Sequence, residues 1–216
     1  MLKWLDNFWY HHKWATIITA FFLIVAVFCC VQIFTKTEYD ACVMFVGAGG
    51  NITNTQYNDI VASLETFADD TDGDGKLEVC FSRETFISDR SDEMAGVLNS
   101  NISSTMQTLL YQDYFILLLD PELYNMYKDS GMFVTLASHG IDAPANAVYD
   151  EYAIRLSECD AYYKMPGLSA IPSDTLLVLK TVPYMKSQSK TEKLVEMQAD
   201  HARMIKKIVS FVAPES

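Results

Sequence analysis

The chain has 216 residues, of which 50% are hydrophobic, and a formal net charge of −12 at pH 7. This length is enough for one domain with a sizeable core. Because so acidic a surface repels phosphates and anionic lipid headgroups, we exclude nucleic acid as a partner. We expect a soluble acidic surface or an affinity for cations.

The first element in chain order is an uncharged apolar run at residues 15–34, ATIITAFFLIVAVFCCVQIF. A helix of this length spans about 30 Å, the thickness of the hydrocarbon core of a bilayer. The run is longer than the apolar region of a cleaved signal peptide, and the bulky Val27 and Phe28 do not suit lipoprotein cleavage before Cys29. We predict an uncleaved transmembrane signal anchor, with signal cleavage and lipidation as the alternatives.

The residues that flank this run predict its orientation. Lys3 and Lys13 precede it with a single acid, Asp6, whereas acidic residues dominate the rest of the chain. The positive-inside rule then predicts a cytoplasmic tail at residues 1–14 and an extracytoplasmic domain at residues 35–216. All three tryptophans lie in the tail, as in an aromatic belt at the membrane surface. We therefore expect a single-pass protein of the cell membrane.

Strand and helix patterns alternate along the extracytoplasmic part. Short continuous apolar runs predict buried strands, and apolar residues at helical spacing predict amphipathic helices. The predicted strands are 41–46, 77–87, 114–119, 152–156 and 176–182, and the predicted helices are 54–68, 91–109, 121–128 and 189–211. This alternation predicts an α/β domain of three layers, with a mostly parallel sheet flanked by helices and one transmembrane helix before it.

Capping residues mark the starts of three of these helices. Thr53–Gln56 and Ser189–Glu192 fit the capping box, and Asp120–Pro121 places an N-cap acid before a proline at the first helical position. His201 lies on the apolar face of the last helix, where we expect a packed side chain rather than a ligand.

The sharpest chemical motif is the acidic segment DTDGDGKLE. Asp70, Asp72 and Asp74 stand at alternate positions before a glycine, as in the first half of an EF-hand calcium loop. In that pattern Lys76 offers its carbonyl oxygen and Glu78 its carboxylate. The twelfth position, normally a glutamate, is a phenylalanine, and a strand rather than a helix follows. We predict a structural Ca²⁺ site at these five residues, with a polar helix-to-strand turn as the alternative.

A glycine-rich segment follows the first predicted strand. In α/β folds, ligands bind beyond the carboxyl ends of strands, and a helix N-terminus offers N–H groups to an anion. The segment lacks the third glycine of the dinucleotide fingerprint and the Gly-Lys-Ser/Thr ending of a phosphate loop. Gly49, Gly50 and Asn51 are therefore candidate ligand-binding residues, with a tight glycine turn as the alternative.

The cysteines and the catalytic motifs give little information about the function. Cys42, Cys80 and Cys159 lie outside the apolar run, and their odd number permits at most one internal disulfide. The sequence contains no CxxC, GxSxG or HExxH motif. We expect a binding or structural role rather than an enzyme.

The segments Tyr114–Asp120, Pro121–Tyr127 and Gly131–Leu136 follow one another as a buried strand, a short helix and an apolar turn. With the strands and helices before them, from about residue 40 to 140, they resemble the first lobe of the extracytoplasmic solute-binding proteins of ABC transporters, which have the type II periplasmic-binding fold. The resemblance implies binding of a small ligand or of a transporter partner. The chain is also similar to small single-pass proteins of Gram-positive gut bacteria that share its aromatic-rich start.

Two functions compete on this basis. The first is a membrane-anchored, solute-binding-like domain that binds a small ligand or a transporter or envelope partner. The second is a calcium-stabilised structural or regulatory ectodomain with no small-molecule ligand. A deep pocket at the strand ends would favour the first.

Overall fold

The computed structural model describes residues 2–34, 39–47, 52–86, 106, 109 and 114–212. The chain divides into two compact units, Met1–Glu38 and Tyr39–Ser216. The predicted helix at 91–109 lies outside the described residues except for Met106 and Leu109, which are helical and buried.

The N-terminal unit contains one helix, α1 (Leu2–Phe34). Its segment His12–Cys30 has a mean hydropathy of 2.1 and is long and apolar enough to cross a membrane. Within the described residues that segment is 0% buried, whereas the core helix of a soluble protein is mostly buried. The prediction of an N-terminal apolar helix is confirmed, and its orientation stays a prediction.

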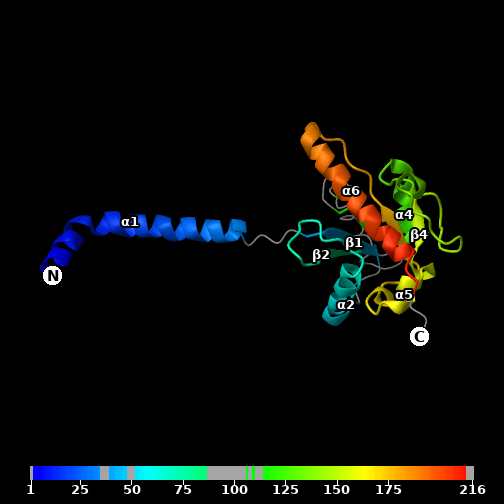
Figure 1. Cartoon of the computed structure of the whole chain (residues 1–216), viewed down its shortest axis with the longest axis horizontal. Helices are drawn as coiled ribbons and strands as arrows, with labels where there is room; N and C mark the ends of the chain where they lie inside the picture. The colour runs from blue at the N-terminus through cyan, green and yellow to red at the C-terminus, as the bar shows by residue number, and fades with distance from the viewer. Residues whose placement is uncertain are drawn as a thin grey trace, which may run out of the picture. The chain divides into compact units, whose positions relative to one another are not determined.

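The second unit, whose main helices are labelled in Figure 1, is built on a sheet. The described strands of this sheet follow the order β2-β1-β3-β5-β4. Its strands are β1 (Ala41–Gly47), β2 (Val79–Thr85), β3 (Ile116–Leu119), β4 (Ala153–Arg155) and β5 (Leu176–Leu179). Each strand starts within two residues of the position that its apolar run predicts.

The α/β class is confirmed, but the prediction of a mostly parallel sheet is wrong. β1 pairs in parallel with β2 and β3, whereas β5 pairs antiparallel with both β3 and β4. The sheet is therefore mixed. An apolar run buried on both faces reads the same in either direction, so the sequence pattern does not define the direction of β5.

Both faces of the central strands β1, β3 and β5 are apolar and buried. In β1, Val43 and Phe45 belong to one hydrophobic cluster, and Met44 and Val46 belong to another. Successive side chains of a strand point to opposite faces, so the two clusters lie on the two sides of the sheet. The same alternation divides the side chains of β3 and β5.

Helices cover each side. Buried residues of α2, α5 and α6 belong to the cluster of Val43 and Phe45, whereas buried residues of α4 belong to the opposite cluster. Their bounds are α2 (Asn54–Glu65), α4 (Pro121–Tyr127), α5 (Asp160–Lys164) and α6 (Gln188–Val209), and the short 3₁₀ helices are η2 (Lys128–Ser130), η3 (Leu136–His139), η4 (Leu156–Glu158) and η5 (Leu168–Ala170).

The capping predictions for α2 and α4 are confirmed. Thr53 Oγ1 accepts a hydrogen bond from the Gln56 amide at 3.3 Å, and Gln56 Oε1 accepts one from the Thr53 amide at 2.9 Å. At α4, the Asp120 carboxylate accepts from the Glu122 amide at 2.8 Å, and Pro121 is the first helical residue. These side chains satisfy amides that have no partner within a helix.

The capping box predicted at the start of α6 is wrong. The helix begins at Gln188, and its N-cap is Ser187. Glu192 accepts a hydrogen bond at 3.0 Å from the Gln188 side chain, one helical turn earlier, instead of from the backbone of Ser189. An i,i+4 pair on the helix surface thus replaces the predicted cap.

Polar contacts join α6 to the sheet. His201 Nε2 accepts from the Cys42 amide at 2.9 Å, so the ring proton lies on Nδ1 and is donated to the Met197 carbonyl at 2.6 Å. Gln198 Nε2 donates to the Lys180 carbonyl at 2.6 Å. His201 is buried, as predicted for a packed residue of the apolar face.

The connection from β4 to β5 presses against the backbone of α2 at Gly167. The Gly167 amide donates to Ser63 Oγ at 3.1 Å. A Cβ atom at position 167 would lie 2.0 Å from the Asp59 carbonyl oxygen, which belongs to the helix backbone and cannot turn aside. Only glycine fits this contact.

We expect Gly167→Ala to lower the free energy of unfolding by roughly 1–3 kcal/mol or more, because the added methyl group forces two packed segments apart. Urea unfolding of the full chain in detergent, followed by circular dichroism, measures the change. Ser169→Ala, an exposed position of the same connection, is the control and should stay within about 0.5 kcal/mol of the parent. Equal midpoints for the two variants would contradict the packing described above.

Candidate metal centre

The loop between α2 and β2 curls around the carboxylate of Asp70. Asp70 Oδ1 accepts from the Gly73 amide at 2.7 Å, and Oδ2 accepts from the Gly75 amide at 3.0 Å. Gly73 and Gly75 have φ angles of 76° and 81°, in the left-handed region that glycine adopts without a steric penalty. The two glycines therefore permit the turn that brings both amides to one carboxylate.

The next two acids of the loop hold the backbone that follows them. Asp72 Oδ1 accepts from the Asp74 amide at 3.0 Å, and Asp74 Oδ1 accepts from the Lys76 amide at 2.8 Å. Asp74 Oδ2 also lies 3.7 Å from Lys76 Nζ, and both side chains are exposed. Exposed pairs of this kind contribute little stability, so the backbone hydrogen bonds set the shape of the loop.

Asp40 ties this loop to the start of β1. It is 7% exposed. Its Oδ1 accepts from the Thr71 amide at 2.6 Å and from Thr71 Oγ1 at 3.0 Å, and its Oδ2 accepts from the Glu78 amide at 2.9 Å. The Asp40 amide donates in return to the Glu78 carbonyl at 2.9 Å. One buried carboxylate thus holds the loop near both its first and its last residues.

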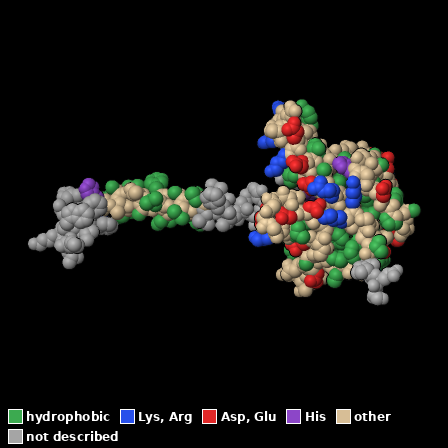
Figure 2. Space-filling view, viewed as in Figure 1, with side chains coloured by type: hydrophobic (Ala, Val, Ile, Leu, Met, Phe, Trp, Pro, Cys, Tyr) green, Lys and Arg blue, Asp and Glu red, His purple; other side chains and the backbone are tan. Residues whose placement is uncertain are grey.

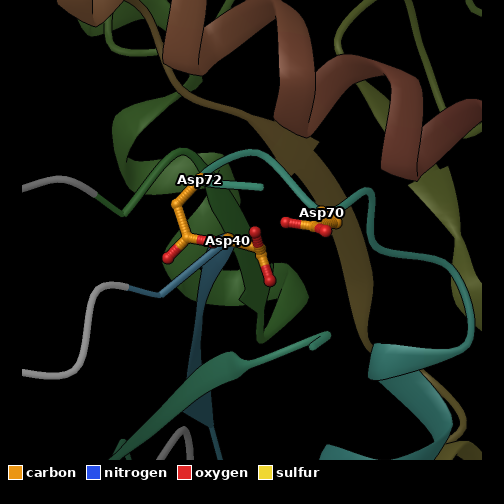
Figure 3. A group of neighbouring side chains, drawn as sticks. All are labelled: Asp40, Asp70 and Asp72. Carbon is orange, nitrogen blue, oxygen red and sulfur yellow. The ribbon is translucent and has the colours of Figure 1, made fainter. Parts of the chain in front are cut away.

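Three carboxylates gather at this point. One carboxylate oxygen each from Asp40, Asp70 and Asp72 lies within 4.8 Å of the other two (Figure 3). Because calcium–oxygen distances are about 2.3–2.6 Å, oxygens up to about 5 Å apart can share one ion. Asp40 is buried, whereas Asp70 and Asp72 are exposed, so the group is open to solvent on the side of the loop. This cluster could hold a metal ion.

The predicted site residues divide between this group and its surroundings. Asp70 and Asp72 belong to it. Asp74 faces Lys76 instead, and Glu78 contributes its amide to Asp40 rather than its carboxylate to the group. The predicted ligand-binding residues Gly49, Gly50 and Asn51 lie outside the described residues.

Asp40 is the group member that sequence reasoning missed. It precedes the first strand by one position and lies 30 residues before Asp70, so no loop motif includes it. The signal that could have identified it is the parallel pairing of β1 with β2, which brings the residue before one strand next to the residue before the other.

The negative charge of Asp69, the acid that precedes the group, is paired with basic side chains of α6. Lys207 Nζ lies 2.5 Å from Asp69 Oδ1, and Arg203 Nε lies 3.4 Å from Oδ2. The hydrogen bond from Lys207 is the largest of the effects that lower the pKa of Asp69. Figure 2 shows basic and acidic side chains side by side on the visible face of this unit. Asp69 therefore anchors the loop to α6 and is not directed at the three-carboxylate group.

Comparison of the chain with protein-family models, with curated proteins and with solved structures gives no match. The resemblance to the first lobe of solute-binding proteins stays a prediction. The geometry itself describes an α/β domain with an oxygen-lined cluster that suits a hard cation.

We expect Asp40→Asn to lower the free energy of unfolding by roughly 1–3 kcal/mol in the presence of a chelator, independently of any metal. The substitution puts an amide donor where one carboxylate oxygen now accepts from an N–H group, so a nearly buried donor loses its partner. Thermal unfolding of the full chain in detergent with EDTA measures the effect. Asp74→Asn, at an exposed position in the same loop, should change stability by less than about 0.5 kcal/mol. A similar loss in both variants would show that Asp40 has no special role in holding the loop.

Proposed function

We propose that this chain is a single-pass, membrane-anchored protein whose extracytoplasmic α/β domain binds Ca²⁺ in a structural role at Asp40, Asp70 and Asp72. The observation that carries the proposal is the convergence of these carboxylates from two segments of the chain within 4.8 Å of one another.

The donor set supports a hard cation. Within the part of the chain that the structure describes, the group offers carboxylate oxygens only, and it includes no histidine or cysteine. Oxygen ligands favour Ca²⁺ and Mg²⁺ over zinc and copper. The irregular loop favours Ca²⁺, which accepts flexible coordination and more ligands, whereas Mg²⁺ requires a near-ideal octahedron. Three negative charges so close together also repel one another until a cation joins them.

The position of the group supports a structural role. Asp40 immediately precedes β1, and the loop that contains Asp70 and Asp72 leads into β2, the parallel neighbour of β1. A cation shared by these residues would hold the first strand, the loop and the second strand together. Because such an ion binds the folded chain and not the unfolded one, it stabilises the domain by mass action.

The membrane assignment is supported by the uncovered apolar segment of α1 and by the charges around it. His12–Cys30 suits the length of a bilayer. Lys3 precedes this segment, and Lys13 is its second residue. By the positive-inside rule these charges favour an extracytoplasmic acidic domain, in surroundings where Ca²⁺ is abundant enough for a site of modest affinity. Capture of a small solute, or of a transporter or envelope partner, stays a prediction that rests on the resemblance alone.

Calcium should raise the melting temperature of the full chain in detergent. At about ten times Kd, binding adds roughly 1.4 kcal/mol, which for a chain of this size is a shift of roughly 3–6 °C. A calcium titration followed by circular dichroism measures it. Mg²⁺ at the same concentration should give a smaller shift, because the loop does not impose an octahedron.

Two variants identify the site in the same titration. Asp72→Asn should abolish the calcium-dependent shift, because it removes one of the converging carboxylates. Asp59→Asn removes the same charge from an exposed position of α2 and should keep the full shift. A shift that is absent from the parent chain, or that survives in Asp72→Asn, would refute the site.

Labelling of single-cysteine substitutions tests the orientation. With a maleimide that does not cross membranes, intact cells should label Ser189→Cys, at an exposed position of α6, above the level of the parent chain. Asn7→Cys, in the predicted cytoplasmic tail, should exceed the labelling of the parent chain only after the cells are opened. The reverse pattern would place the domain in the cytoplasm and would remove it from the extracytoplasmic calcium that the proposal invokes.

A further inference from the structure

Two cysteines stand directly opposite each other on neighbouring strands. In the parallel pair of β1 and β2, Cys42 is the register partner of Cys80. Neighbouring strands lie about 4.8 Å apart, and disulfides join residues whose Cα atoms are about 4.4–6.8 Å apart. The register therefore brings these two positions within disulfide range, although they are 38 residues apart in the sequence.

The two thiols also lie on the same side of the sheet. The neighbours of Cys42 in β1, Ala41 and Val43, and the neighbours of Cys80 in β2, Val79 and Phe81, all belong to one hydrophobic cluster. Because side chains alternate along a strand, both cysteines point to the opposite face. Each is half-buried, so a small reagent has access to them.

The hydroxyl group of Tyr114 gives an independent indication that the two thiols are neighbours. It lies 3.7 Å from Cys80 Sγ. The pKa of Tyr114 is raised to about 12. Burial is the largest cause of this shift, and the nearby Cys80 and Cys42 contribute to it. The Tyr114 side chain thus interacts with both cysteines from the same face of the sheet.

We propose that Cys42 and Cys80 form a redox-active dithiol that closes to an intramolecular disulfide by exchange with an external disulfide. This modification goes beyond the calcium site and does not depend on it. It joins β1 to β2 covalently and encloses α2 and the acidic loop in one covalent ring.

The exchange proceeds in two steps. One cysteine thiolate attacks an external disulfide, forms a mixed disulfide and releases one external thiolate. The second cysteine thiolate then attacks the sulfur of the first cysteine, forms the Cys42–Cys80 bond and releases the other external thiolate. The two protons of the cysteine thiols pass through solvent to the released thiolates. The two cysteines are oxidised, and the external disulfide is reduced to two thiols.

Cys159 is the third cysteine of this unit and does not take part. It is 1% exposed, and its thiol donates to the Arg155 carbonyl at 3.7 Å. Burial raises its pKa to about 11, so it holds almost no reactive thiolate at neutral pH. The three cysteines of this unit thus consist of one pair and one unreactive thiol.

Incubation of the reduced full chain in detergent with excess oxidised glutathione tests the pairing. After the remaining thiols are alkylated in denaturant, peptide mass spectrometry should find the Cys42 and Cys80 peptides linked, with Cys159 alkylated. Dithiothreitol should release the link. If Cys42 and Cys80 are both alkylated in the folded chain after this treatment, or if either is linked to Cys159, the proposal is overturned.

Single substitutions provide the matched controls. In Cys42→Ser the exchange cannot close, so Cys80 should retain glutathione as a mixed disulfide, and Cys80→Ser should leave it on Cys42. Cys159→Ser should give the same linked peptides as the parent chain. Folding of each variant is checked by circular dichroism before oxidation. A variant that fails this check does not affect the result for the parent chain, whose linked peptides alone decide the pairing.

Discussion

The central strands of the sheet in this domain have no polar face, and the rest of the fold follows from that constraint. Side chains of β1, β3 and β5 are buried on both sides, so each side needs its own cover of helices. α2, α5 and α6 supply one cover, and α4 contributes to the other. Polar groups in such an interior, whether of the backbone or of side chains, need hydrogen-bond partners. The buried polar side chains therefore have specific partners. Among the described residues, no buried side-chain nitrogen or oxygen lacks a hydrogen-bond partner.

The start of the sheet is where this apolar interior meets a charged surface. Asp40 lies at that boundary: it is almost fully buried, yet it accepts hydrogen bonds from both Thr71 and Glu78. A carboxylate in this position is stabilised by backbone N–H groups, and a cation at the candidate site would add to an arrangement that already exists. The loop shape and the candidate metal site therefore have one origin, since the hydrogen bonds that fold the loop also bring Asp70 and Asp72 next to Asp40. On the other side of the loop, Lys207 fixes Asp69 to α6.

Local signals in the sequence predict most elements but not how they pair. The Thr53–Gln56 capping box and the Asp120–Pro121 start define α2 and α4, because caps act within one turn of helix. The direction of β5 is not encoded locally, since LLVL is apolar on both faces whichever way it runs. The same limit applies to the site. Asp70 and Asp72 are evident from their spacing, whereas Asp40 joins them only through the pairing of β1 with β2, as Cys42 joins Cys80.

The contacts of α6 have a consequence for the order in which this chain folds. The amide of Cys42, at the start of the first strand, finds its acceptor on His201, 159 residues later, and Asp69 finds its cation 138 residues later. A nascent chain therefore emerges with its first strand and its acidic loop complete in sequence but lacking these partners. Contacts of such long range form late and slowly. If the domain is exported through a membrane channel behind its anchor, the 22-residue helix α6 must cross the membrane before the Cys42 amide of the first strand can reach its acceptor on His201. Until then the chain stays unfolded enough to be threaded.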